Sequence, residues 1–246
     1  MIDRGHEVIG IVTTMPSESD LHSERLCDLA TNLKIPLLTD QQIYDSLDGK
    51  NSNGVPDLSD VDLVLSMFHQ KRIKEPILNL PKICAINIHP APLPEFQGWG
   101  VYNYAILENV QYWGVTAHYM DEGFDTGPII AQRRFDVDMN TATAYSLERM
   151  TQPVIEQVVH DVFDALAKGK PTGKPQVDGR YISKSMFLKL RIIEPDDSSE
   201  LVDRKTRAFW YPPYPGAQIR ISGRLYTVID DAQLGDIADL MFPNRT

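Results

Sequence analysis

The chain has 246 residues, 42% of them hydrophobic, which is enough to bury the core of one domain or of one domain with an appendage. Its 24 basic and 34 acidic residues give a formal charge of -10, so no basic surface is available to bind nucleic acid. No apolar run reaches the roughly 18 residues of a membrane span, and the first residues do not resemble a signal peptide, so we expect a cytoplasmic protein that acts on a small molecule.

The first half of the chain alternates between short apolar strands and helices. Residues 7–14 (EVIGIVTT) predict a strand covered on both faces, residues 26–33 have apolar side chains at helical spacing, and residues 36–39 predict a second strand. Two further buried strands are predicted at residues 62–68 and 85–89, with a short helix between them. This alternation predicts an α/β fold with a mainly parallel sheet.

The pattern changes after residue 111. Residues 112–120 and 128–138 are longer, partly alternating strands joined by the loop DEGFDTG, and residues 141–168 predict a long amphipathic helix. The sequence GKPTGKP that ends this helix is typical of a linker. We therefore predict a catalytic domain over residues 1–168 and a C-terminal extension over residues 169–246.

The extension is predicted to contain a helix over residues 198–208 and a β-hairpin over residues 218–229. At the other end of the chain, residues 1–5 resemble the last turn of a helix followed by glycine. A doubly wound sheet begins with a strand and then a helix, so we expect the first βα unit to be missing here. Cys27 and Cys84 are expected to be buried thiols without a catalytic role.

The segment NIHPAPLPEFQG, residues 87–98, carries the side chains that most suggest chemistry. Asn87 and His89 are two positions apart on a strand, so they point to one face at its carboxyl end, where open α/β sheets bind ligands. Transfer of an acyl group to an amine needs a donor to the developing oxyanion and an acceptor for the amine proton, which Asn and His supply. Asp125 is a candidate to orient His89 and to favour its protonated form.

On spacing alone, other roles for these residues stay open. Asn87 could cap a turn, His89 could fill the core, and Asp125 could close an Asx turn. A metal site built from His89, His118 and Asp125 is a further alternative. The sequence lacks HxH or HxxxH spacing, however, so we predict no metal and expect His118 to pack along its strand.

These motifs resemble the signature of the folate-dependent formyltransferases, in which N-x-H-P leads into LPxxxG and is followed by GvTxH and DxGxDTGPII. They stand here as NIHPAPLPEFQG and GVTAHYMDEGFDTGPIIAQ, and the resemblance covers residues 5–165. It implies a Rossmann-like domain that binds N10-formyltetrahydrofolate, with Asn87, His89 and Asp125 as the catalytic residues. It also implies direct attack of the amine on the formyl carbon, without an acyl-enzyme.

The resemblance further implies an apolar slot for the pterin ring of the folate. The residues expected to bind it are Phe68, Gln70, Arg72, Ile73, Asp121, Glu122 and Gly123.

The tail RKTRAFWYPPYPGAQIRISGRLYTVID is similar to that of the bacterial sugar N-formyltransferases. This similarity implies a homodimer that modifies a dTDP-, UDP- or GDP-linked amino dideoxysugar for surface-polysaccharide synthesis, such as that of lipopolysaccharide O-antigen. Aromatic faces and an arginine suit a nucleotide, although these aromatics could instead attach the tail to the core or to a second subunit. The residues expected to bind the substrate are Gly98, Trp99, Arg207, Trp210, Tyr211 and Tyr214.

Other functions remain as alternatives. The acidic charge argues against the methionyl-tRNA branch of the family, whose substrate is a polyanion. A shortened homologue that binds folate or nucleotide without turnover, and a hydrolase that releases formate, are the remaining hypotheses.

Overall fold

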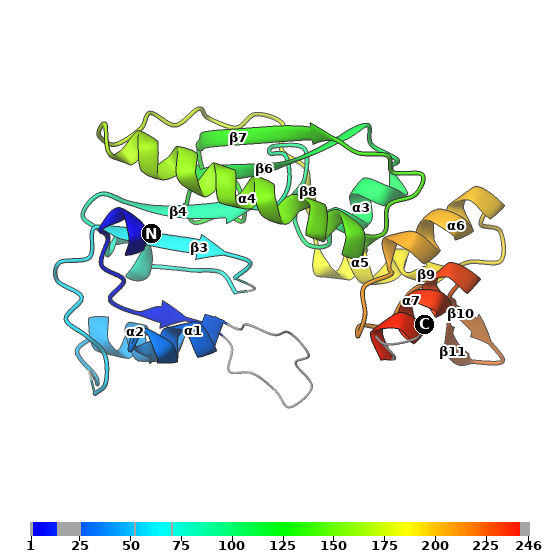
Figure 1. The fold of residues 1–246 in the computed structure, drawn as a ribbon, viewed down its shortest axis with the longest axis horizontal. Coiled ribbons are helices and arrows are strands. Elements are labelled where there is room, and N and C mark those ends of the chain that lie inside the picture. The colour runs from blue at the N-terminus through cyan, green and yellow to red at the C-terminus, as the bar shows by residue number, and fades with distance from the viewer. Residues whose placement is uncertain (1, 14–25, 52, 70, 242–246) are drawn as a thin grey trace. The chain divides into compact units, whose positions relative to one another are not determined.

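The computed structural model describes residues 2–13, 26–51, 53–69 and 71–241 (Figure 1). The chain forms two compact units. Their bounds are Met1–Val64 with Lys71–Ala85 for the first, and Leu65–Gln70 with Ile86–Thr246 for the second. This division does not fall at residue 168, where the sequence predicted a domain boundary.

The first unit carries the early αβ alternation that the sequence predicted. β1 and β2 pair in parallel, and Gly5 follows the first short helix with a positive φ of 81°. A second helix was not predicted. It begins after Thr39, whose side chain forms a capping box with Gln42. The elements of this unit are η1 (Ile2–Arg4), β1 (Ile11–Val12), α1 (Leu26–Asn32), β2 (Leu37–Leu38), α2 (Asp40–Leu47) and η2 (Ile77–Asn79).

A four-stranded sheet of order β3-β4-β6-β7 supports the site. Its strands are β3 (Leu63–Met67), β4 (Cys84–His89), β6 (Tyr112–Tyr119) and β7 (Ile129–Asp136). Figure 1 shows β3 and β4 side by side with arrowheads pointing the same way. The pairs β4·β6 and β6·β7 are antiparallel.

The α/β class is confirmed, and the antiparallel late strands qualify the prediction of a mainly parallel sheet. Their direction has a simple cause. Only residues 120–128 connect β6 to β7, and a parallel pair would need a crossover of a dozen residues or more.

Helix α4 (Ala144–Leu166) packs against β6 and β7, and α3 (Val101–Leu107) packs against α4 and α6 (Ser199–Ala208). The side chain of Thr143 caps α4 by accepting the backbone N–H of Ser146. The sequence predicted α4 and α6 but not α3.

The C-terminal segment holds the predicted hairpin. It turns at Ser222 and Gly223, which both have positive φ, as two-residue hairpin turns of the primed types require. Two further helices were not predicted. The elements are α5 (Lys184–Leu190), β9 (Ile192–Ile193), β10 (Gln218–Ile221), β11 (Arg224–Thr227) and α7 (Asp231–Met241). Among the described helices, none has the length and apolar character that crossing a membrane requires.

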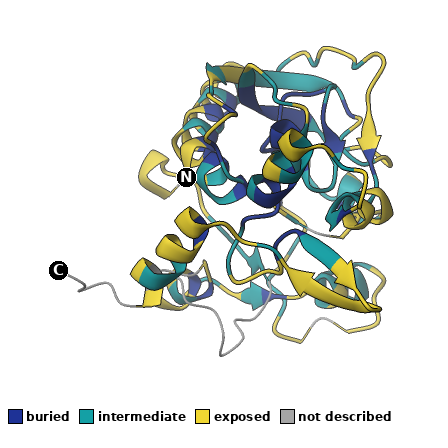
Figure 2. Ribbon diagram, turned by 90° about the vertical axis from the view of Figure 1, so that its right-hand side faces the viewer, coloured by how far each residue is buried: buried dark blue, intermediate teal, exposed yellow. Residues whose placement is uncertain are grey.

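The core of the second unit includes residues from both sides of position 168. Trp113 on β6 is fully buried, and its ring lies 5.2 Å from that of Phe96. Ile182, Ala208 and Phe209 belong to the same buried cluster, and buried positions are dark blue in Figure 2. The extension therefore shares a core with the predicted catalytic domain, because its apolar side chains fill the same interior.

Candidate active site

Asn87 and His89 lie on β4, and Asp125 lies in the loop between β6 and β7. The Asp125 carboxylate joins them, because its Oδ1 accepts an N–H from Asn87 Nδ2 at 3.2 Å and lies 3.4 Å from His89 Nδ1. Its Oδ2 accepts the backbone N–H of Gly98 at 2.9 Å. His89 is 5% exposed, and Asn87 and Asp125 are half-buried. Strand alternation sets Asn87 and His89 on one face, and the loop brings Asp125 to them.

The hydrogen bonds of His89 determine which ring nitrogen carries the proton in the neutral form. Nε2 lies 2.7 Å from the carbonyl oxygen of Phe96, and a carbonyl can only accept, so Nε2 carries the hydrogen. Nδ1 therefore faces the Asp125 carboxylate without a proton. A proton that binds at Nδ1 forms an imidazolium paired with a carboxylate.

His118 also belongs to this group, although the sequence predicted that it only packs along its strand. Its Nδ1 lies 2.8 Å from the carbonyl oxygen of Tyr119 and must donate to it, so Nε2 is free to accept from Asn87 Nδ2 at 3.1 Å. The same Nε2 lies 3.5 Å from Asp125 Oδ1. The cause is the strand register, which places His118 directly opposite Asn87.

These contacts fix the orientation of the Asn87 amide. One N–H points to His118 and the other to Asp125. The flipped amide would set its oxygen against two acceptors, which excludes it. The sequence could not reveal this role of His118, because local patterns do not give the register of two strands.

Burial and charge act against each other on the pKa values of this group. Burial lowers the pKa of His89, and the neighbouring Asp125 carboxylate only partly offsets this. Burial alone would raise the pKa of Asp125, but His89, His118 and the N–H of Gly98 lower it below its ordinary range. At neutral pH the site therefore holds an ionised Asp125 and a neutral His89.

This protonation state predicts a loss of stability in mild acid. Unfolded His89 titrates near its ordinary value of 6.5, whereas its folded pKa is lower, so below pH 6.5 the unfolded chain binds more protons. The free energy of unfolding should then fall as the pH decreases from 7.5 to 5. Replacing His89 by Gln should flatten this slope, and denaturant titrations at each pH measure it.

The matched control is His160→Gln, which removes an exposed histidine on α4. This variant should keep the wild-type slope. Equal slopes for the wild type and His89→Gln would show that His89 does not contribute to the pH dependence.

The loop of Asp125 depends on close backbone approach. Asp125 itself has a positive φ of 58°, and a Cβ on Gly127 would lie 1.9 Å from the carbonyl oxygen of Tyr119. Asp121 Oδ1 accepts from the backbone N–H of Gly123 at 2.9 Å and from Thr126 Oγ1 at 2.7 Å. Asp121 thus stabilises the loop, beside the pterin contact predicted for it.

The other residues predicted to contact the pterin are mostly exposed. Phe68 follows the end of β3 with a positive φ of 55° and is 46% exposed. Glu122 and Gly123 are exposed in the Asp125 loop. Arg72 is exposed and Ile73 half-buried, and both belong to the first unit, whereas the prediction for Gln70 lies outside the described residues. Pterin binding by this set stays a prediction.

Gly98 and Trp99 of the predicted substrate site are adjacent in the chain, and Gly98 contacts Asp125. Gly98 donates to the Asp125 carboxylate, and the N–H of Trp99 donates to the carbonyl of Ile182 at 2.9 Å. Lys184 Nζ lies 4.8 Å from the centre of the Trp99 ring, a cation–π contact. Trp99 is half-buried.

The tail residues predicted to bind the nucleotide have mostly structural contacts. The guanidinium of Arg207 donates to the carbonyls of Met139 and Ala142 at 2.6 and 3.0 Å, and it also pairs with Asp203. Trp210 is buried, and its ring N–H donates to Asp236 at 3.2 Å. The Arg207 contacts attach the tail to the core, whereas the Trp210 contact joins two parts of the tail, so both side chains have structural roles.

The two tyrosines of the tail differ in exposure. The hydroxyl of Tyr211 donates to the carboxylate of Glu148, which again favours a structural role. Tyr214 lies beside the Tyr211 ring and is 67% exposed, so it is free to meet a ligand.

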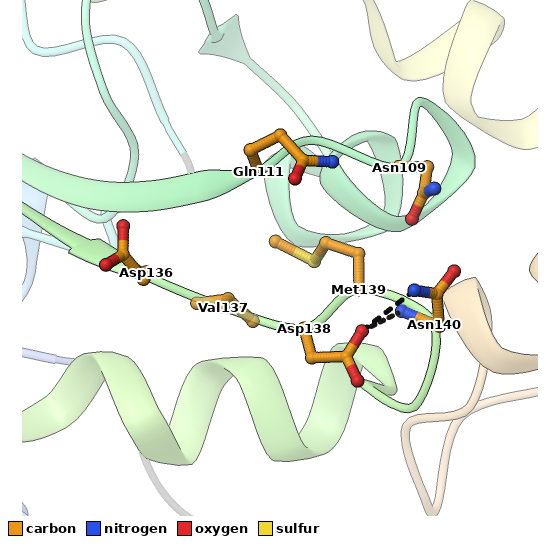
Figure 3. A pocket seen from close by; sticks show the side chains of 7 residues that line it. All are labelled: Asn109, Gln111, Asp136, Val137, Asp138, Met139 and Asn140. Atoms are coloured by element: carbon orange, nitrogen blue, oxygen red, sulfur yellow. Dashed lines mark hydrogen bonds between the residues drawn. The ribbon is translucent and has the colours of Figure 1, made fainter.

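A polar pocket of about 500 Å³ lies between the loop after α3 and the end of β7 (Figure 3). Asp138 accepts from the backbone and side-chain N–H groups of Asn140, both at 3.0 Å. The pocket contains none of the Asn87, His89 and Asp125 group. Its lining residues are Asn109, Gln111, Asp136, Val137, Asp138, Met139 and Asn140. In the part of the chain that the structure describes, no three His, Cys, Asp or Glu side chains are arranged to hold a metal ion.

Comparison with known proteins points to one family. The family described as Formyl transferase matches residues 37–162. GDP-perosamine N-formyltransferase of Brucella melitensis is 31% identical over 169 residues, which are 69% of this chain and 64% of that protein. Methionyl-tRNA formyltransferase of Wolbachia pipientis is 29% identical over 233 residues, which are 91% of this chain and 72% of that protein. The chain thus spans less than two thirds of the Brucella relative.

A solved structure shares the fold. The N-formyltransferase of Helicobacter canadensis, crystallised with folinic acid and dTDP-3-aminofucose, aligns with a TM-score of 0.64 and 21% identity. The alignment covers 85% of this chain and 73% of that one. At this identity the likeness concerns the fold alone.

Proposed function

Because the chain belongs to the formyl transferase family, we propose that it transfers a formyl group from N10-formyltetrahydrofolate to the amine of a nucleotide-linked amino sugar. The observation that supports this most is the partly buried group in which one carboxylate, that of Asp125, contacts both Asn87 and His89. Direct acyl transfer to an amine needs one oxyanion donor and one proton acceptor, and this group supplies both.

His89 and Asp125 would manage the proton. As the amine attacks the formyl carbon, a new C–N bond forms and the amine must lose a proton. His89 Nδ1 is the ring nitrogen without hydrogen, and the ionised Asp125 beside it stabilises the imidazolium that results. The same proton then goes to the donor nitrogen as its bond to the formyl carbon breaks.

Asn87 would stabilise the negative charge on the formyl oxygen. Both of its N–H groups are already aimed, one at His118 and one at Asp125. A formyl oxygen in this site would take over or share one of these N–H groups as its charge grows. Because the amide is held by its neighbours, little reorganisation is needed during the reaction.

The residues at this sheet edge fit a folate donor, which would supply the formyl carbonyl. The exposed ring of Phe68 follows the end of β3, and His89 ends the neighbouring strand β4. The aromatic ring of Phe68 and the polar side chain of His89 thus lie at the carboxyl ends of adjacent strands, where open α/β sheets bind ligands. The Helicobacter canadensis protein was crystallised with folinic acid, which supports the same class of donor.

The acceptor is proposed from charge and from the relatives. The formal charge of -10 disfavours a polyanion such as transfer RNA. The Brucella relative is named for GDP-perosamine, and the Helicobacter canadensis structure contains dTDP-3-aminofucose. Both are nucleotide-linked amino sugars. The methionyl-tRNA branch is the second candidate, since the Wolbachia relative matches a larger share of this chain.

A turnover assay tests the proposal. Purified protein is incubated with N10-formyltetrahydrofolate and with dTDP-, UDP- and GDP-linked 3- and 4-amino sugars, and product masses are followed. One formylated sugar is the expected result. A formylated methionyl-tRNA would favour the second candidate, and formate without any acceptor would indicate a hydrolase. Donor binding without product would support the alternative of a binding protein.

A homodimer is part of the proposal. Ile221, Leu225 and Tyr226 of the β10–β11 hairpin are 53%, 44% and 47% exposed, which offers apolar area for a second subunit. A mass measurement in solution that finds only monomer would contradict the proposed homodimer. The cytoplasmic location and a role in surface-polysaccharide synthesis stay predictions from the sequence.

A further inference from the structure

The segment of residues 171–182, whose first residues belong to the predicted linker GKPTGKP, lies along the Asp125 loop. Lys174 and Ile129 exchange two backbone hydrogen bonds of 2.8 Å. Strand β8 (Tyr181–Ile182) pairs in parallel with β5 (Gln97–Gly98). The backbone N–H of Gly98 in β5 is the one that donates to the Asp125 carboxylate. The segment is therefore attached on both sides of the Asp125 loop.

Gln176 is the residue of this segment that reaches the loop backbone. Its Nε2 donates to the carbonyl of Asp125 at 2.9 Å and to that of Gly127 at 2.7 Å. Its Oε1 accepts from Gln97 Nε2 at 3.0 Å, and Gln97 Nε2 donates also to the Asp125 carbonyl at 3.1 Å. Two amides thus converge on the peptide carbonyl of the central carboxylate residue.

The fit around these amides is tight. Gln97 is 4% exposed, and a Cβ on Gly179 would lie 2.4 Å from its Nε2. Little room is left for Gln97 to move, and Gln97 in turn orients the Gln176 amide. The pair therefore works as a rigid clamp on the Asp125 peptide.

The clamp matters because Asp125 has an unfavourable backbone. Its positive φ of 58° is uncommon for a residue with a side chain, and such conformations persist only when their surroundings fix them. The direction of the carboxylate follows from this backbone. A change in the Asp125 peptide would move Oδ1 away from Asn87 and His89.

We propose that Gln176 is a positioning residue, whose side-chain amide holds the Asp125 peptide so that the carboxylate meets Asn87 and His89. Gln176, the residue directly after the predicted linker GKPTGKP, is then part of the active site. This inference rests on the proposed function for its kinetic consequences, but the geometry itself can be tested without turnover.

The test compares Gln176→Met, which keeps the length of the side chain without its hydrogen bonds, and Gln176→Glu, which sets a carboxylate against two carbonyls. The control is Gln111→Glu, which makes the same change of charge as Gln176→Glu at an exposed residue of the polar pocket. We expect kcat to fall about 10- to 100-fold in both Gln176 variants, since small misplacements of a reacting group have effects of this size. KM should stay within about threefold, because Gln176 contacts the loop and not the substrate.

The second readout is the NMR titration of the His89 ring, with its signal assigned by its loss in His89→Gln. Asp125 raises the pKa of His89, so a displaced carboxylate in Gln176→Met, which adds no charge, should shift the His89 titration to lower pH. His118 also faces Asp125, and its signal is followed in the same spectra. The titration needs no substrate, so it decides the inference even if the wild type turns over none of the acceptors.

The outcomes separate cleanly. A lower kcat together with a shifted His89 titration supports the positioning role. A lower kcat with an unshifted titration, a raised KM with unchanged kcat, or wild-type values in both readouts would each overturn it. If Gln176→Met does not fold, as judged by circular dichroism, Gln176→Leu, which also adds no charge, takes its place in both readouts.

Discussion

Asp125→Asn should lower kcat about 10²- to 10⁴-fold, the range of a lost general acid–base contribution. The variant keeps the volume of the side chain but removes the charge that stabilises protonated His89. The new NH2 group must also face either the N–H of Gly98 or the N–H of Asn87, so at least one hydrogen bond is lost. Steady-state kinetics with the acceptor found in the turnover assay measure the effect.

Asp178→Asn is the matched control for this experiment. Asp178 has a φ of 56°, close to the 58° of Asp125, but its side chain is exposed. Asn tolerates this conformation as well as Asp does, so activity and stability should stay close to wild type. An Asp125→Asn enzyme with at least a tenth of wild-type kcat would contradict the proposed role of the carboxylate.

Gly98→Ala should destabilise the protein by about 2–5 kcal/mol, from the sum of backbone strain and overpacking. Gly98 has a positive φ of 92°, and an added Cβ would lie 2.4 Å from the carbonyl oxygen of Ile182. Since that oxygen belongs to the backbone of β8, it cannot move aside alone. The shift should also disturb the N–H of Gly98 that donates to Asp125, so kcat should fall with stability.

Gly223→Ala separates the cost of backbone strain from the cost of overpacking. Gly223 has a positive φ of 81°, but nothing lies within 4 Å of an added Cβ. This variant should therefore lose only the roughly 1–2 kcal/mol of backbone strain. Denaturant unfolding of both variants gives the comparison, and equal losses would show that the contact with β8 does not matter.

The sequence by itself determined the group at the end of β4 and the main elements around it. Strand side chains alternate with a period of two, so NxH places Asn87 and His89 on one face whatever the rest of the fold does. The long helix α4 and the hairpin at Ser222 and Gly223 follow from local periodicity and turn chemistry in the same way. Such features depend on neighbours in the chain and can be read from it.

Only the tertiary structure decided what completes the site. His118 enters because strand register sets it opposite Asn87, and register is a contact between distant segments that local periodicity does not encode. Gln176 directly follows the glycine- and proline-rich stretch that was predicted as a linker, yet its amide donates to the carbonyls of Asp125 and Gly127. Partly buried backbone carbonyls need donors wherever the chain can bring them, and no local pattern records which distant side chain will serve.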